Sequence, residues 1–263
     1  QKKNGRSSKT LFLDSQKKNV NNINPYLSTG TSLFINRMSQ PISVGFPILR
    51  YGSMPNDGGN LVLNKDEVDT LINVYPQTKN IIKNFIGSYE FINHQMRWCL
   101  YIKDDVLSLY SSIPEIQNRL LKVREHRINS TEKSTRLLAD YPNRFYFSAY
   151  KETNAVIIPR VSSESRQYIP MGYIDAETII SDSALAIYDA PMWLFGILTS
   201  LMHMAWVKTV GGRLKTDYRY SAQLCYNTFP FPKISEAKKQ EIEEAAEEVL
   251  LVREDYPGKT LAE

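Results

Sequence analysis

The sequence contains few residues that bind metals or form disulfides. Its 263 residues include two cysteines, Cys99 and Cys225, and three histidines, His94, His126 and His203. Two widely separated cysteines exclude a disulfide framework and are typical of a reducing compartment, so we predict a cytoplasmic protein. The histidines and cysteines show no ligand spacing, and no metal-binding residue is predicted.

Signatures of common enzymes are also missing. The chain has no G-x-G-x-x-G after a predicted strand, no P-loop, no nucleophile elbow and no H-E-x-x-H. We therefore predict no catalytic residue and no cofactor-binding residue in this chain. The segment SMPNDGGNL, residues 53–61, has the composition of a loop that binds phosphate through backbone amides. A tight surface turn explains the same residues and is the favoured interpretation.

Long apolar runs are scarce. The longest is PMWLFGILTSLMHMAWV at residues 191–207. A membrane-spanning helix needs about 20 apolar residues, and this run is shorter and has His203 near one end. We therefore predict a buried helix over residues 190–209 and no membrane partner.

Charge is unevenly distributed along the chain. The formal net charge is +4 and the isoelectric point is near 8.8. Residues 1–18 carry six basic residues against one acidic residue, whereas residues 235–263 carry four basic against nine acidic residues. A basic body with an acidic C-terminal segment is compatible with a polyanionic partner, although many proteins with other functions share this balance.

Local patterns predict several helices. Asn64 and Glu67 form a capping box that opens a helix over residues 65–75. Apolar residues at helical spacing predict further helices at residues 114–127 and from about residue 235 to residue 254.

Strands are predicted between these helices. The aromatic segment at residues 90–102 suggests a bent strand or a strand pair, and residues 144–150 and 154–161 suggest a hairpin. Because helices and strands do not alternate in a βαβ repeat, the expected fold class is α+β. We expect a mixed β-sheet with flanking helices, followed by a C-terminal helical segment.

A basic segment near the C-terminus has the composition of a DNA-backbone contact. GGRLKTDYRYS, residues 211–221, places Arg213, Lys215 and Arg219 among Tyr218 and Tyr220. Interleaved basic and aromatic residues suit a phosphate backbone. A solvated basic turn is the alternative.

A second polar segment, VSSESRQYIP at residues 161–170, follows a strand-like run. Glu164, Arg166 and Tyr168 alternate there, which predicts that they share one face of an extended segment. In a DNA major groove, arginine binds guanine O6 and N7, and glutamate accepts a hydrogen bond from cytosine N4. Glu164 and Arg166 would then read the two halves of one C·G pair. Composition alone favours the alternative, in which they form surface ion pairs.

Several longer motifs together resemble one known family. They are YGSMPNDGGNL, IGSYEFIN, RWCLYI, IPRVSSESRQYIPMGY, FGILTSLMHMAWVKTVGGRLKTDYRYS and YNTFPFP. In this order they are similar to the target recognition region of the MmeI-like restriction–modification enzymes, from about Ile23 to the C-terminus. Those enzymes join an endonuclease, an adenine-specific DNA methyltransferase and a recognition domain in one chain.

The resemblance implies a division of labour. Double-stranded DNA and the methyltransferase and endonuclease domains of the same parent chain are the expected partners. S-adenosylmethionine is expected in the parent methyltransferase domain, and no cofactor is expected in this segment. The implied domains are a basic linker or methyltransferase end at 1–35, a DNA recognition domain at 36–186 and a helical brace at 187–263.

The resemblance also assigns the polar segment. The stretch after VSSE is the family's specificity determinant, which maps onto Glu164, Arg166 and Tyr168 as base-reading residues. Two functions from other classes remain open. One is a protein-interaction module that uses the apolar helix, and the other is an enzyme fragment with its own cofactor site.

Overall fold

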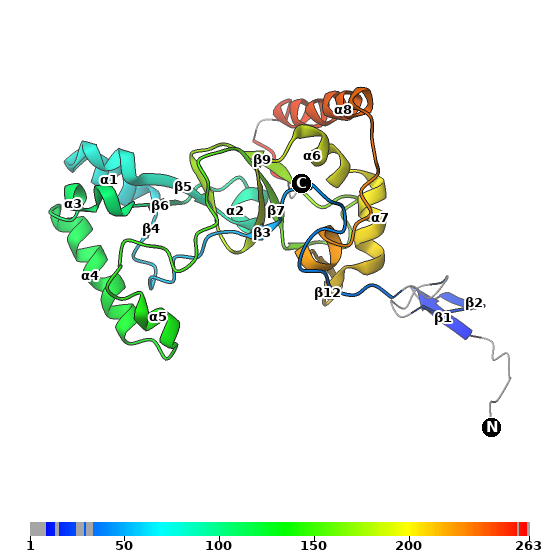
Figure 1. Ribbon diagram of the computed structural model, residues 1–263, viewed down its shortest axis with the longest axis horizontal. Helices are drawn as coiled ribbons and strands as arrows, with labels where there is room; N and C mark the ends of the chain where they lie inside the picture. Colours follow the sequence, from blue (N-terminus) through cyan, green and yellow to red (C-terminus); the bar gives the residue numbers. More distant parts are fainter. Residues whose placement is uncertain (1–8, 14–15, 25–28, 30–33, 257, 262–263) are drawn as a thin grey trace.

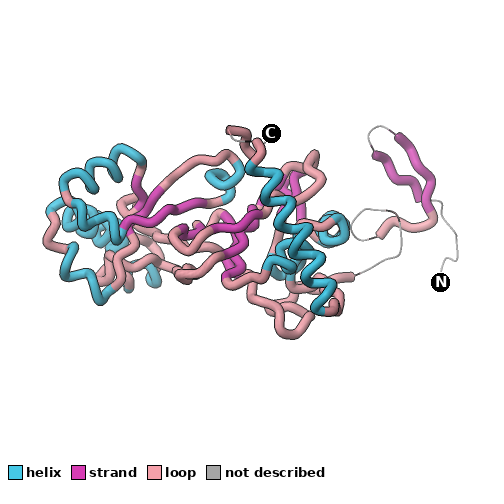
Figure 2. Tube along the Cα trace, turned by 90° about the horizontal axis from the view of Figure 1, so that it is seen from above, coloured by secondary structure: helices cyan, strands magenta, loops and turns pink. Residues whose placement is uncertain are grey.

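The computed structural model describes residues 9–13, 16–24, 29, 34–256 and 258–261. Helices gather at both ends of an elongated body, and strands lie between them (Figure 1). The view from above in Figure 2 shows the same arrangement, with strands running through the centre. The expected α+β class is confirmed.

The first lobe is built on a four-stranded sheet in the order β10-β5-β6-β4. Apolar side chains from this sheet, including Phe85 and Leu100, pack against Ile116 and Val123 of α4. The elements of this lobe are β4 (Val62–Leu63), α1 (Lys65–Val74), η1 (Pro76–Ile81), β5 (Ile82–Ile86), α2 (Ser88–Ile92), β6 (Trp98–Leu100), η2 (Asp104–Val106), α3 (Leu107–Tyr110), α4 (Pro114–Ile128), α5 (Lys133–Leu137) and β10 (Thr178–Ile180).

A second four-stranded sheet lies at the centre, in the order β3-β11-β7-β9. Its strands are β3 (Arg50–Tyr51), β7 (Ala155–Pro159), β9 (Gly172–Ile174) and β11 (Ala184–Tyr188). Every residue of β7 and β11 is buried. Continuous burial follows because both faces of this sheet are covered, one by the first lobe and the other by the C-terminal helices.

The two sheets are tied together where β10 leads into β11. Gly52 lies so close to Ser181 that a Cβ atom at Gly52 would fall 2.2 Å from the Ser181 carbonyl oxygen. Ser53 donates its backbone N–H to the Ile180 carbonyl at 2.7 Å. Gly52, the first glycine of the YGSMPNDGG motif, is therefore required because two backbones approach closely at this position.

The second lobe consists of helices packed on the central sheet. They are α6 (Met192–Leu198), α7 (Leu201–Val210), the short π-helix η3 (Ala222–Tyr226) and α8 (Glu236–Glu254). Helices α6 and α8 pack closely because Gly196 faces Ile242 without a side chain. None of the described helices is both long enough and apolar enough to cross a lipid bilayer.

A small three-stranded sheet, in the order β12-β13-β8, borders this lobe. It contains β8 (Val161–Ser162), β12 (Gly212–Leu214) and β13 (Asp217–Arg219). A separate hairpin of β1 (Lys9–Leu13) and β2 (Gln16–Val20) lies apart from the body in Figure 1.

Several local predictions are confirmed. The Asn64 side chain accepts from the Glu67 N–H, and the Glu67 carboxylate accepts from the Asn64 N–H, which is the predicted capping box. Helix α4 covers the predicted range, and α8 begins after Ser235, whose hydroxyl accepts from the Lys238 N–H. These features depend on residues three or four apart, and they can therefore be predicted from the sequence.

Three other local predictions are wrong. Residues 190–209 form two helices, because the Ser200 hydroxyl caps a new helix by accepting from the His203 N–H. The predicted hairpin at 144–161 is absent from these described residues, since β7 pairs with β11 and β9. Only Trp98–Leu100 is a strand within 90–102.

The proposed division into domains stays a prediction. The segment at 1–35 includes the β1–β2 hairpin, and part of it lies outside the described residues. The apolar core of the second lobe contains Leu185 and Ile187, one on each side of the proposed boundary at residue 186. Leu194 and Phe195 from α6 belong to the same core. The C-terminal helices and the central sheet therefore share buried surface.

Candidate nucleic-acid interface

Strand pairing brings the two polar segments together. Strands β12 and β13 form a hairpin over residues 212–219, which we call the basic hairpin. In β13, Tyr218 and Arg219 pair with Ser162 and Val161 of β8, so the basic hairpin lies against the start of VSSESRQYIP. The Glu164 backbone N–H donates to the Asp217 carboxylate at 3.3 Å. The residues predicted to contact the DNA backbone thus lie on a small sheet, and strand β8 of that sheet leads directly into the residues predicted to read bases.

The three basic side chains of the hairpin are exposed. The guanidinium carbon of Arg213 lies 3.8 Å from the centre of the Tyr218 ring, and its Nη1 donates to the Thr216 carbonyl at 3.0 Å. Lys215 occupies the tip with φ 57°, a conformation that tight hairpin loops demand. No described carboxylate lies within ion-pair distance of Arg213, Lys215 or Arg219. Their positive charge is available to a partner.

The tyrosines of the hairpin serve the core. Tyr218 is 6% exposed and Tyr220 is 3% exposed. The Tyr220 hydroxyl is hydrogen-bonded to His203 Nε2 at 2.8 Å, and burial raises the pKa of this phenol. Burial also lowers the pKa of His203 to about 3, so the imidazole is neutral at pH 7. The basic and aromatic residues that are interleaved in the sequence therefore differ in burial. The basic side chains are exposed, and the tyrosines are buried.

The segment after β8 is not extended as predicted. The Ser163 carbonyl accepts from the Arg166 N–H at 3.2 Å, and the Ser163 and Ser165 hydroxyls are 2.9 Å apart. Serine side chains that bond nearby backbone favour turns over strands. Because of this turn, Glu164 and Arg166 do not share one face of a strand. We call residues 163–170 the recognition loop.

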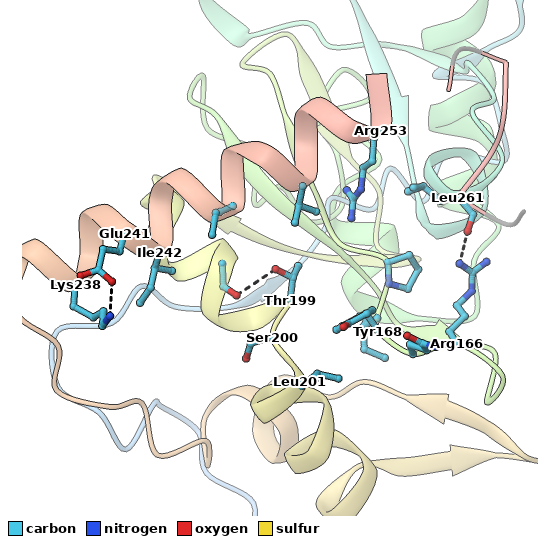
Figure 3. Close-up of a pocket in the computed structure, with 17 residues that line it drawn as sticks. Arg166, Tyr168, Thr199, Ser200, Leu201, Lys238, Glu241, Ile242, Arg253 and Leu261 are labelled. Atoms are coloured by element: carbon cyan, nitrogen blue, oxygen red, sulfur yellow. Dashed lines mark hydrogen bonds and ion pairs between the residues drawn. The ribbon is translucent and has the colours of Figure 1, made fainter. Parts of the chain in front are cut away.

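The recognition loop borders a groove beside α8. Figure 3 shows Arg166 and Tyr168 at one end of a cavity of about 890 Å³, with the junction of α6 and α7 and the side of α8 as its walls. Arg166 donates to the Leu261 carbonyl, and Tyr168 is 41% exposed. Glu164 is exposed and does not line this groove.

Helix α8 fixes the far end of the recognition loop. Arg253 donates from Nη1 to the Met171 carbonyl at 2.7 Å, and burial lowers the pKa of its guanidinium. Ile169 and Met171 are buried in the core. The loop is therefore anchored at both ends, by β8 and by α8, while its central residues face solvent.

A buried arginine that the sequence interpretation missed organises the SMPNDGG segment. Arg127 is 0% exposed and donates five hydrogen bonds to backbone carbonyls at 2.7 to 3.1 Å. The acceptors are Pro55, Asn56, Leu138, Tyr141 and Arg144. A signal for this role exists in the sequence. Ile116, Leu120, Val123 and Arg127 follow helical spacing, and all four face the core.

The Asp57 side chain stabilises the same segment. Its buried carboxylate accepts from the backbone N–H groups of Gly59, at 3.2 Å, and of Leu61. Two backbone amides of the segment are therefore already bonded within the protein and are not available to a phosphate. The favoured interpretation of this segment as a tight turn is confirmed, with Asn56, Gly58 and Gly59 all at positive φ.

Comparison with known proteins agrees with these motifs. A family model described as the MmeI target recognition domain matches residues 29–233. The chain belongs to the MmeI target recognition domain family. Within this family, a curated relative named DNA methyltransferase A, from Bacillus subtilis (strain 168), is 49% identical over 255 residues. That match covers 97% of this chain and 29% of the relative.

A solved structure of the type IIL restriction-modification enzyme MmeI in complex with DNA shares the architecture of this target recognition domain. The TM-score is 0.90 at 38% sequence identity, and the match covers 97% of this chain and 35% of that enzyme. The chain thus spans about a third of the length of both proteins.

Proposed function

We propose that this chain is the sequence-specific recognition domain of a longer adenine-specific DNA methyltransferase of the restriction–modification type. It binds a short duplex site and holds it for a separate catalytic domain, which flips the target adenine out of the helix. The observation that carries this proposal is the sheet that joins an unneutralised basic hairpin to an exposed polar loop. Family membership supports the same function.

Within this proposal the hairpin binds phosphates. Arg213, Lys215 and Arg219 are exposed and have no described carboxylate partner, so each can replace a counterion on the DNA backbone. Their contribution is independent of sequence, and it fixes the register of the duplex against the recognition loop.

The recognition loop reads bases through Glu164, Arg166 and Tyr168. Glu164 projects into solvent, whereas Arg166 donates to Leu261 and must exchange this carbonyl for a guanine edge. Side-chain rearrangement of this size is common when interfaces form. S-adenosylmethionine is bound by the parent's methyltransferase domain, and the endonuclease is a further part of the parent.

The test begins with the full-length parent. Modification-sensitive sequencing of a host that expresses it gives the methylated motif, and a duplex with that motif is then titrated at several salt concentrations. Replacing Arg213, Lys215 or Arg219 by Ala should weaken binding to all duplexes by similar factors. The slope of log K against log salt should fall by about 0.9 for each phosphate that the variant no longer neutralises.

Arg124→Ala is the matched control, because Arg124 is exposed but pairs with Asp140 at 3.4 Å. It should leave the affinity and the slope unchanged. Unchanged binding by all three hairpin variants would contradict the assignment of the hairpin to phosphate. Absence of any salt-dependent DNA binding by the parent would favour a protein-interaction module instead.

A further inference from the structure

Arg160 occupies the bend between β7 and β8, immediately before the strand that leads into the recognition loop. Its backbone is held on both sides. The Arg160 N–H donates to the Ser88 hydroxyl at 3.3 Å, and its carbonyl accepts from the Tyr220 N–H at 2.8 Å. The next residue, Val161, pairs with Arg219 of the basic hairpin. Arg160 is therefore fixed where the hairpin, the loop and the central sheet meet.

The side chain of Arg160 is held in one orientation. Its guanidinium carbon lies 4.9 Å from the centre of the Tyr51 ring, and Nη1 donates to the Asp182 carbonyl at 3.1 Å. Asp182 is itself positioned, because its N–H donates to the Ser53 carbonyl at 3.0 Å. A ring on one face and a carbonyl at one end fix the plane of the guanidinium.

The charge and most of the donors of Arg160 remain unused within the described structure. No described carboxylate lies within 4.0 Å of its guanidinium, and Asp182 contributes its carbonyl only. Arg127 provides the contrast, since it is fully buried and satisfied by five carbonyls. Arg160 is partly exposed, and Tyr51, whose ring lies against it, is 53% exposed.

We propose that Arg160 is a further DNA-backbone contact, which binds a phosphate next to the site of the recognition loop, and that Tyr51 positions it. A planar guanidinium with unused N–H groups matches a phosphate in a bidentate manner. Phosphate is favoured over a base edge because Tyr51 and Asp182 hold the side chain against the protein surface. The inference rests on the proposed function and adds an anchor at the bend between the central sheet and the sheet that holds the hairpin.

The experiment uses the full-length parent and two duplexes, one with the methylated motif and one without it. Arg160→Gln should weaken binding to both by a similar factor, about ten-fold, and lower the salt slope by about 0.9. Arg160→Lys should keep the slope but bind more weakly, since an ammonium lacks the planar fork. Tyr51→Leu should also keep the slope and lose affinity. The methylated motif should stay the same in every variant.

Arg124→Gln is the control, and thermal unfolding verifies that each variant is folded. Unchanged affinity and slope in Arg160→Gln, while Arg213→Ala weakens binding, would overturn the proposal. If Arg160→Gln does not fold, Arg160→Lys decides, and unchanged affinity there overturns the bidentate contact. A changed methylated motif would make Arg160 a base reader and overturn it too. If the Arg213, Lys215 and Arg219 variants also bind normally, the failure lies with the proposed function.

Discussion

Two polar loops of this protein differ in how their polar groups are used. In the SMPNDGG segment, the Asp57 carboxylate accepts backbone N–H groups, and Arg127 takes up the carbonyls of Pro55 and Asn56. In the recognition loop, the Glu164 side chain is exposed, and Tyr168 is 41% exposed. The polar groups of the SMPNDGG segment are therefore bonded within the protein, whereas those of the recognition loop are available to a partner.

This difference separates a structural loop from a candidate recognition surface. Satisfied buried polar groups fix a backbone but leave no donors or acceptors for a ligand. A recognition surface needs the opposite, which is a fixed backbone with polar side chains that are still available. The recognition loop meets this condition because β8 and Arg253 hold its ends. Each of the following predictions tests one side of the comparison.

The largest effect is expected at Arg127. Arg127→Met should lower the free energy of unfolding by about 3–5 kcal/mol, because five carbonyls lose a charged donor and only those of Pro55, Leu138 and Tyr141 keep a backbone N–H donor. Denaturant unfolding of the 263-residue chain measures this. The control is Arg136→Met, since Arg136 is exposed and bonds only two carbonyls, those of Ser130 and Thr131. Equal losses in both variants would contradict the structural role of Arg127.

A pH effect is expected behind the recognition surface. His203 has a pKa of about 3 in the folded protein because of burial, against the ordinary value of 6.5. Between these values the unfolded chain binds a proton that the folded chain does not, so stability falls as the pH falls. The loss should reach roughly 2 kcal/mol at pH 5 relative to pH 8.

His203→Gln removes this titration, so its stability should fall less than that of the original protein between pH 8 and pH 5. Carboxyl groups contribute equally to both proteins, and the difference between them isolates the histidine. Parallel pH profiles would show that His203 is accessible to protons in the folded state, which would contradict its place in the core with Tyr220.

Short-range features of this fold could be predicted from the sequence, and long-range pairings could not. The capping box at Asn64 and the cap at Ser235 could be predicted, because their partners lie three residues away. The pairing of β8 with β13 could not, since it joins segments far apart in the chain. It is this pairing that brings both candidate sites together.

The extended geometry of the recognition loop was predicted from period-two alternation and is wrong. The alternation ignores Ser163 and Ser165, whose hydrogen bonds stabilise a turn in place of a strand. The role of Arg127 was missed because its partners are distant in the sequence. An arginine on the apolar stripe of a helix is usually placed at the surface, and its five acceptors come from segments that only the fold brings together.

A change in specificity is expected at the recognition loop. The double substitution Glu164→Lys with Arg166→Asp exchanges donor and acceptor, so the parent should prefer G·C over C·G at one position of its motif. A contact of this type is worth about 1–3 kcal/mol of discrimination. Genome-wide methylation mapping of the parent measures the motif. Each single variant should be less active than the double variant. An unchanged motif in an active double variant would show that both residues are solvated surface side chains.

The smallest effect is expected at Glu164, and it gives the sharpest form of the comparison. Glu164→Gln should change the free energy of unfolding by no more than about 0.5 kcal/mol, because the side chain is exposed and has no side-chain hydrogen bond within the described structure. Asp57→Asn makes the same chemical change in the other loop, where the carboxylate is buried and accepts two N–H groups. It should cost about 1–3 kcal/mol. In the parent the order should reverse, so that a folded Glu164→Gln variant loses discrimination at one base pair and a folded Asp57→Asn variant keeps the motif. Equal stability losses in the two variants would mean that the recognition loop is as closed as the structural one.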